Sequence, residues 1–244
     1  LGSTLERVCA AAAPGVSTGE LDAMAEEALR AAGGVPAFKG YPGGTGAAPF
    51  PGTICASVNE EVVHGIPGSR VLEEGDIVGI DIGLIKDGWH ADSAETLPVG
   101  EVTTEAGRLL DVTEECLWRA IGAIAPGKRL SVIGIAVETL AREQDFSVVE
   151  TLVGHGIGEQ MHEDPQVPNY RCFSMPDPVM DEGLVLAIEP MINAGTKRVV
   201  TLADGWTVVS ADRKLSAHYE HTVAVTAEGP RVLTERPRRW TGAH

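Results

Sequence analysis

Two segments far apart in the chain repeat one unusual pattern. Residues 73–81 (EEGDIVGID) and 181–189 (DEGLVLAIE) each begin with acidic residues and a glycine, continue as an apolar run and end on a carboxylate. An Asp-Gly-Trp triplet follows each segment, at 87–89 and 204–206, and a further carboxylate comes later in each case. Ordered repetition of this kind predicts two related halves that face each other, with two pairs of carboxylates in the middle.

Helical and strand patterns are mixed along the rest of the chain. Helical patterns run over 17–34, where Ser17 and Glu20 form a capping box, over about 104–125 and over about 131–144. Runs rich in β-branched residues lie at 76–85, 151–158, 183–190 and 218–226. This mixture predicts an α+β fold. We expect a single domain over 1–244, with halves of roughly 1–125 and 126–234, a Gly- and Pro-rich loop at 40–52 and a frayed basic tail at 235–244.

The first apolar strand carries a carboxylate that its neighbours do not explain. Asp87-Gly88 is a hairpin signal, and a two-residue turn there pairs Lys86 with Trp89 and Gly83 with Asp92. Strand side chains alternate with period two, so Asp81 and Asp92 then lie diagonally on one face. Their repulsion favours a bound cation between them. The alternative is that one of the two is a surface aspartate flanking the hairpin.

The second half poses the same problem. Glu189 follows an apolar strand, and Glu220 shares a strand face with His218 and Thr222. A lone buried Glu is usually paired with Arg or Lys, but few basic residues lie near either segment. His155 is flanked by glycines, which let other groups approach closely. A single histidine is more often a packed or surface residue. We infer a ligand role for His155 only because the sequence also contains four carboxylates with few basic residues nearby. This mostly hard ligand set suits manganese, iron or cobalt, with zinc also able to bind; its members are Asp81, Asp92, His155, Glu189 and Glu220.

Charge and cysteine usage exclude several classes of protein. The net charge of −16 argues against broad nucleic-acid binding. No apolar run approaches the roughly 18 residues of a membrane span, and no signal-peptide pattern is seen at the start. The cysteines lie far apart without a CxxC pair, which favours free thiols in the cytoplasm; they are Cys9, Cys55, Cys116 and Cys172.

Five motifs together resemble the methionine aminopeptidases. They are NEEVVHGIP at 59–67, IDIGLIKDGWHAD at 80–92, HGIGEQMHEDPQV at 155–167, AIEPM at 187–191 and SAHYEHT at 216–222. The resemblance covers nearly the whole chain. It implies the pita-bread (creatinase/aminopeptidase) fold, with two pseudo-symmetric halves around a dimetal centre, in the bacterial type I form.

The resemblance also implies roles for individual residues. Asp81 would bind one ion, His155 and Glu189 the other, and Asp92 and Glu220 would bridge the two. The catalytic residues would be Glu189 as proton shuttle, with His64 and His162 contacting the substrate and its carbonyl group. The methionine pocket would be formed by Phe38, Tyr41, Cys55, Met161 and Trp206.

Some positions depart from the family pattern near that pocket. Met161 stands where an aromatic residue is usual, and Val35 where a cysteine is common. The loop at 43–52 is longer than usual. These departures bear on selectivity and rate, and they leave the metal ligands unchanged.

The function implied is removal of the initiator methionine from new proteins with a small second residue. It would be carried out by a cytoplasmic monomer with two divalent ions (Co, Mn, Fe or Zn), and the ribosome is a candidate partner. Three alternatives stay open: a proline-specific aminopeptidase or prolidase, a specialised enzyme altered by its long loop, and a non-catalytic binding protein on the same scaffold.

Overall fold

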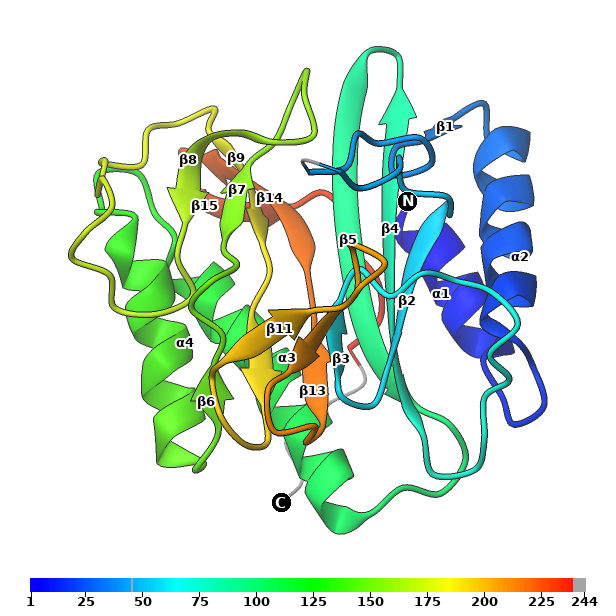
Figure 1. The fold of residues 1–244 in the computed structure, drawn as a ribbon. Helices are drawn as coiled ribbons and strands as arrows, with labels where there is room; N and C mark the ends of the chain where they lie inside the picture. Colours follow the sequence, from blue (N-terminus) through cyan, green and yellow to red (C-terminus); the bar gives the residue numbers. More distant parts are fainter. Residues whose placement is uncertain (45, 239–244) are drawn as a thin grey trace.

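The computed structural model describes residues 1–44 and 46–238 (Figure 1). In this part of the chain there are four α-helices, which are α1 (Gly2–Ala11), α2 (Thr18–Ala31), α3 (Thr104–Ala123) and α4 (Ser131–Glu143). The predicted helices correspond to α2, α3 and α4, and the Ser17/Glu20 capping box is present at the start of α2. The sequence analysis missed α1, which buries Leu5 and Val8.

A first sheet is built around one long hairpin. Strand β4 (Ile77–Lys86) pairs along its whole length with β5 (Trp89–Pro98), and it also pairs with β1 (Val35–Pro36) and β2 (Ile54–Val58). Helices α1 and α2 pack on this sheet through a core that includes Leu21, Leu29 and Ile80.

A second sheet has the order β15-β14-β9-β7-β8. Its strands are β7 (Gly154–Gly156), β8 (Glu163–Val167), β9 (Val185–Ile188), β14 (His221–Thr226) and β15 (Gly229–Val232). Helices α3 and α4 pack together against it, through a core that includes Leu117, Ile133 and Leu186. In Figure 1 the two sheets lie side by side between two pairs of helices. The division of the chain near residue 125 stays a prediction.

Two small sheets complete the fold. One has the order β13-β10-β6 and the other β11-β12-β3. Their strands are β3 (Glu61–Val63), β6 (Ser147–Val148), β10 (Met191–Asn193), β11 (Val199–Thr201), β12 (Val208–Ser210) and β13 (Ser216–His218). The α+β prediction is therefore confirmed. None of the helices in the described residues is long and apolar enough to cross a membrane.

The register of the β4–β5 hairpin is the predicted one. Lys86 pairs with Trp89 and Gly83 with Asp92. Both turn residues have positive φ, 52° at Asp87 and 86° at Gly88, as a type I′ turn requires. Because the turn sets the pairing of the whole hairpin, it also decides which face Asp81 and Asp92 share.

Two predictions about irregular segments have different outcomes. The described residues of 40–52 form neither helix nor strand, as predicted. The expectation of a frayed tail at 235–244 is wrong at Arg236, whose side chain is only 5% exposed and pairs with Glu95. Residues 239–244 lie outside the described part of the chain. A buried partner far away in the sequence is the physical reason for the difference.

The capping box gives a test of the local folding argument. Ser17 accepts a hydrogen bond from the backbone of Glu20, so we expect Ser17→Ala to lower the free energy of unfolding by about 1 kcal/mol. Urea denaturation measures this difference. Ser3→Ala, which changes an exposed serine inside α1, is the matched control. An equal effect of the two substitutions would contradict the capping role.

Candidate metal centre

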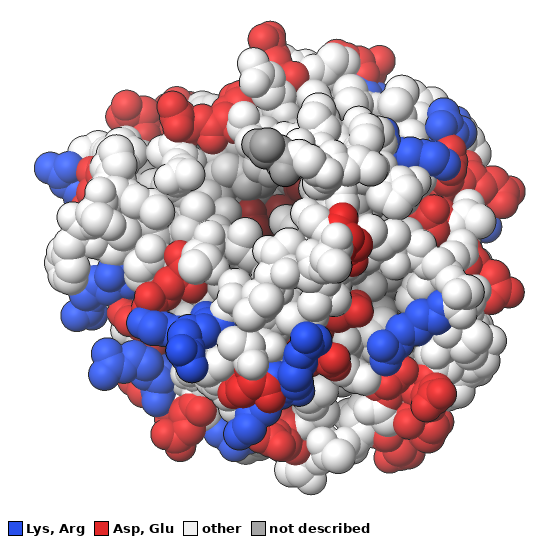
Figure 2. All heavy atoms as spheres, viewed as in Figure 1, with Lys and Arg blue, Asp and Glu red and all other residues white. Residues whose placement is uncertain are grey.

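The five predicted ligands meet in one cavity between the two sheets. Asp81 comes from β4, Asp92 from β5 and His155 from β7, while Glu189 follows β9 and Glu220 joins β13 to β14. The cavity has a volume of about 170 Å³. Figure 2 shows a hollow on this face with acidic residues at its floor and mostly uncharged residues around it.

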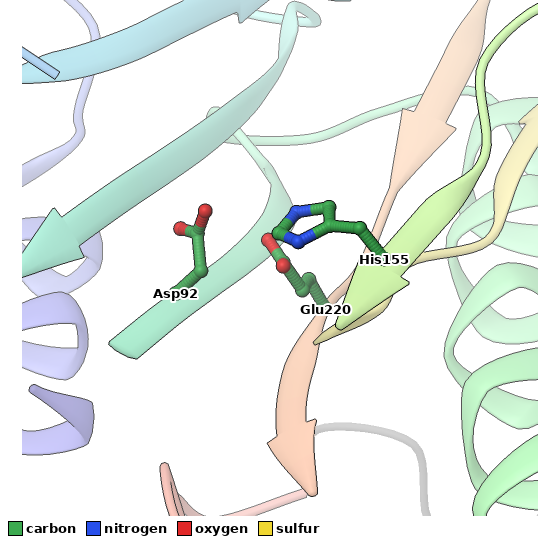
Figure 3. Close-up of side chains that lie close together, drawn as sticks. All are labelled: Asp92, His155 and Glu220. Carbon is green, nitrogen blue, oxygen red and sulfur yellow. The ribbon is translucent and has the colours of Figure 1, made fainter. Parts of the chain in front are cut away.

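Three of these side chains converge closely enough to share an ion. One ligand atom each from Asp92, His155 and Glu220 lies within 4.8 Å of the others, and all three residues are buried. Figure 3 shows them pointing into one space, Asp92 from β5, His155 from β7 and Glu220 from the link that leads into β14. The Nε2 atom of His155 is also 3.5 Å from Oε1 of Glu189.

The geometry of His155 leaves one ring nitrogen available to a metal. Its Nδ1 atom lies 2.8 Å from the carbonyl oxygen of Gly156, and a carbonyl can only accept a hydrogen bond. Nδ1 therefore carries the proton, and Nε2 presents its lone pair to the cavity. Burial lowers the pKa of His155 to about 4, so the ring is neutral at physiological pH.

The glycines beside His155 are needed because the backbones of the two neighbouring strands lie very close to them. A Cβ atom at Gly154 would collide with the carbonyl oxygen of Ala187 on β9, and one at Gly156 with that of Asp164 on β8. The two glycines thus let β7 lie between its neighbours with His155 directed at the cavity.

The carboxylates are held in surroundings that disfavour their charge. Burial raises the pKa of Asp81 to about 7. Burial, then the nearby carboxylates, raises the pKa values of Asp92, Glu189 and Glu220 well above the ordinary range. Among the described residues, Asp81 Oδ1 and Glu220 Oε1 are buried and have no hydrogen-bond partner. Divalent cations would satisfy these oxygens and offset the repulsion, so the residues present fit a metal centre.

Backbone contacts hold ligands from the two sheets in register. The backbone N–H of Asp92 donates to the Thr222 hydroxyl, which donates in turn to the carbonyl oxygen of Asp92, at 2.9 and 2.8 Å. The Glu220 N–H donates to the Ala94 carbonyl at 2.8 Å. Asn169 donates its side-chain amide to the Glu189 carbonyl at 3.0 Å. The sequence analysis gave Thr222 and Asn169 no role, because their partners are distant in the chain.

The two predicted catalytic histidines also line the cavity. His162 lies beside His155, with ring centroids 4.3 Å apart, and its Nδ1 is hydrogen-bonded to the Tyr41 hydroxyl at 2.7 Å. His64 sits at a left-handed backbone position with φ of 60°. Burial lowers the pKa of both rings, that of His64 to about 4.

The predicted apolar pocket adjoins these groups. The same cavity is lined by Phe38, Tyr41, Cys55, Met161 and Trp206. Val35 does not belong to this wall: it is 53% exposed and lies on the short strand β1, opposite Ile85. The expectation that Val35 affects the pocket is therefore not supported by its position.

Phe50 is a pocket residue that the sequence analysis missed. It lines the cavity, is 2% exposed and packs edge-on against Trp206, with ring centroids 5.2 Å apart. The Trp206 indole N–H donates to the Ala48 carbonyl at 2.8 Å, so the long loop itself fixes this wall. A signal was present, because an aromatic residue between two prolines is unusual in a Gly-rich loop.

Comparison with known proteins is consistent with this geometry. The chain is 52% identical over 221 residues to methionine aminopeptidase 1 of Bacillus subtilis, covering 91% of this chain and 86% of that protein. It is 48% identical to a methionine aminopeptidase of Clostridium perfringens, covering 96% and 91%. The crystal structure of methionine aminopeptidase from Thermotoga maritima matches with a TM-score of 0.91 at 39% identity, covering 96% and 92%.

A more distant likeness concerns the fold alone. The prolidase of Pyrococcus horikoshii matches with a TM-score of 0.76 at 20% identity, and the alignment covers 98% of this chain but 59% of that one. The predicted pita-bread fold is confirmed by these neighbours. The model of metallopeptidase family M24 matches residues 2–227, and the chain belongs to that family.

Proposed function

We propose that this chain is a dimetal aminopeptidase that removes N-terminal methionine from peptides and new proteins with a small second residue. The observation that carries the proposal is one cavity in which four carboxylates, those of Asp92 and Glu220 buried, and a neutral histidine adjoin a narrow apolar pocket. The names of the most similar relatives support the same activity.

The residues divide into those that would hold ions and those that would act on the substrate. We propose that Asp81 binds one ion, His155 and Glu189 bind the other, and Asp92 and Glu220 bridge the two. Oxygen-rich sites with one imidazole accept manganese, iron, cobalt or zinc. When bound, such ions acidify water and polarise carbonyl groups.

Glu189 is the proposed proton carrier. Burial raises the pKa of Glu189, and neighbouring carboxylates add to the rise, so this carboxylate accepts a proton more readily than an ordinary glutamate does. It would take a proton from the attacking water and deliver it to the leaving amine. His162, whose Nδ1 is tied to Tyr41, is positioned to direct Nε2 at the scissile carbonyl group, and His64 lies on the other side of the pocket beside Trp206.

The pocket supports methionine as the side chain recognised. Aromatic rings, a thiol and a thioether line the small cavity, and such soft apolar surfaces suit an unbranched thioether. All these residues come from one chain, which supports action as a monomer. Four cysteines, three of them buried and none joined in a disulfide within the described residues, support a cytoplasmic location, where ribosomes would supply the substrates.

A short peptide panel tests the proposed activity. With Mn²⁺, Fe²⁺ or Co²⁺ we expect Met-Ala peptides to be cut and Met-Lys peptides to be left intact, because the cramped pocket must also accept the second side chain. His155→Ala should abolish turnover and keep the circular dichroism spectrum of the wild type. His90→Ala, which removes an imidazole that does not line the cavity, is the control.

Three results of this panel would contradict the proposal. Equal rates on Met-Ala and Met-Lys would remove the initiator-methionine role. Cleavage of Xaa-Pro peptides in preference to Met-Ala would favour a proline-specific enzyme. No turnover and no metal uptake with any of the three ions would favour a non-catalytic binding protein.

The raised carboxyl pKa values predict how metal and pH act together. Folded metal-free protein keeps protons on Asp81, Asp92, Glu189 and Glu220 that the unfolded chain releases above pH about 4. Stability from these groups therefore falls as pH rises toward 7 and beyond. Buried histidines act in the opposite direction, but only below pH about 6.5, where the unfolded rings become charged. A metal must displace the protons, so its binding tightens as pH rises.

We therefore expect the rise in Tm caused by Mn²⁺ to be larger at pH about 7.5 than at about 5.5. Thermal unfolding in EDTA and in Mn²⁺ measures it. Asp92→Asn replaces a carboxyl group whose burial disfavours its ionised form by a neutral amide, so it should raise the Tm of the metal-free protein at the higher pH and reduce the Mn²⁺ effect. A Mn²⁺ effect that is independent of pH, or unchanged in Asp92→Asn, would contradict this interpretation.

Phe50 gives a test of selectivity. Its ring forms part of the pocket wall, so Phe50→Ala should widen the pocket and raise the rates on Phe-Ala and Met-Leu relative to Met-Ala, by about tenfold. The ratios of kcat/KM measure this change. Phe173→Ala is the matched control, since Phe173 is 90% exposed. Unchanged ratios in a folded Phe50→Ala protein would show that this ring does not limit the substrate.

A further inference from the structure

The last described segment of the chain returns to the junction between the two sheets. Thr234 is buried, and its hydroxyl contacts Nδ1 of His221 at 2.9 Å and accepts from the Thr222 N–H at 3.1 Å. At the other end, the Arg238 guanidinium lies 3.7 Å from the centroid of the Trp118 ring, which packs edge-on against His221. Thr234 therefore anchors the chain just before Arg236, whereas Arg238 makes only this ring contact and is itself exposed.

The Arg236 side chain is directed inward to strand β5. Its Nε donates to Glu95 Oε2 at 2.9 Å, and both side chains are about 95% buried. One terminal nitrogen donates to the Ser93 hydroxyl at 2.6 Å, and the other donates to the Ala94 carbonyl. One guanidinium thus contacts three consecutive residues, which follow Asp92 directly in the chain.

The same guanidinium also contacts the opposite side of the cavity. The nitrogen that donates to Ser93 lies 3.1 Å from the carbonyl oxygen of Glu220 and 3.0 Å from Nδ1 of His221. The Glu220 carbonyl also accepts from the Ser93 hydroxyl at 3.0 Å and from the Ala94 N–H at 3.4 Å. Three donors, two from β5 and one from Arg236, therefore converge on the backbone of a predicted metal ligand.

We propose that Arg236 is a positioning residue for the metal centre, which ties the backbone beside Asp92 to that of Glu220 and so sets the separation of the two bridging carboxylates. The proposal rests on the proposed function. Asp92 lies on β5 and Glu220 just before β14, so only contacts between distant parts of the chain fix their separation. Metal ligands must lie within a few tenths of an ångström of their ideal distances, which makes such a separation decisive for affinity.

The chemistry of arginine explains why this residue type is used. Its planar fork presents five N–H donors in fixed directions, whereas lysine is a point charge with a flexible stem. A lysine at 236 could pair with Glu95 but could not also hold the Ser93 hydroxyl and the Glu220 carbonyl in one plane. The positioning role therefore depends on the shape of the side chain as well as on its charge.

The test compares Arg236→Ala and Arg236→Lys with Arg238→Ala. Arg238 is exposed and lies two residues further along, so its removal changes the charge equally and leaves the contacts to β5 and Glu220 intact. Titration calorimetry measures Mn²⁺ binding to each metal-free protein at a temperature where all are folded. We expect Arg236→Ala to bind Mn²⁺ at least about tenfold more weakly, Arg236→Lys to weaken binding to an intermediate degree, and Arg238→Ala to match the wild type.

Kinetics provide a second measurement that a purely stabilising contact would not change. At saturating Mn²⁺ we expect Arg236→Ala to lower kcat on a Met-Ala peptide while KM stays within about twofold, because Arg236 does not line the pocket. If Arg236→Ala fails to fold, the comparison of Arg236→Lys with Arg238→Ala decides the question. Weakened Mn²⁺ binding in folded Arg236→Lys supports the proposal.

Two kinds of failure can be told apart. Equal Mn²⁺ affinity in the folded Arg236 variants and in Arg238→Ala, whatever their Tm values, overturns the positioning role and leaves the metal centre in place. Wild-type protein that takes up no Mn²⁺ overturns the proposed centre, and the role of Arg236 falls with it.

Discussion

The mutual repulsion of four carboxylates that line one small cavity is the constraint on which the rest of the structure depends. Two like charges about 4 Å apart repel by roughly 4 kcal/mol at the effective dielectric of a protein site. Asp81, Asp92, Glu189 and Glu220 line one small cavity, where burial raises the pKa of each carboxyl group and, for the last three, the neighbouring carboxylates add to the rise. A fold that keeps such a group together without metal must fix it from outside, through backbone contacts that do not depend on the charge of the side chains.

Those contacts are concentrated where the two sheets meet. The reciprocal hydrogen bonds of Thr222 with Asp92 and the pairing of Ala94 with Glu220 bring β5 to the start of β14. His155 reaches the cavity from β7 because two glycines remove the Cβ atoms that would push neighbouring strands away. The ligands are thus positioned mainly by main-chain geometry, and the apolar cores behind each sheet keep that geometry rigid.

The sequence predicted most reliably those structural features that are determined by residues close together in the chain. The Asp87-Gly88 turn fixed the hairpin register, and with it the shared face of Asp81 and Asp92. The capping box predicted where α2 begins. The carboxylates in apolar segments predicted residues that line the cavity. The failures are long-range. Arg236 and Glu95 are 141 positions apart, so nothing local distinguished a buried arginine from its neighbours in a basic tail. Phe50 belonged to the pocket because a loop folds back on Trp206, which spacing alone does not reveal.

The position of Arg236 in the chain has a consequence for how the protein becomes competent during synthesis. A ribosome makes Arg236 after all five proposed ligands, since the last of these is Glu220. Only 16 positions separate Glu220 from Arg236, so the last proposed ligand and the side chain that ties it to β5 are made almost together. On the positioning role proposed for Arg236, a chain that ended between these two residues would carry every proposed ligand but would bind metal weakly.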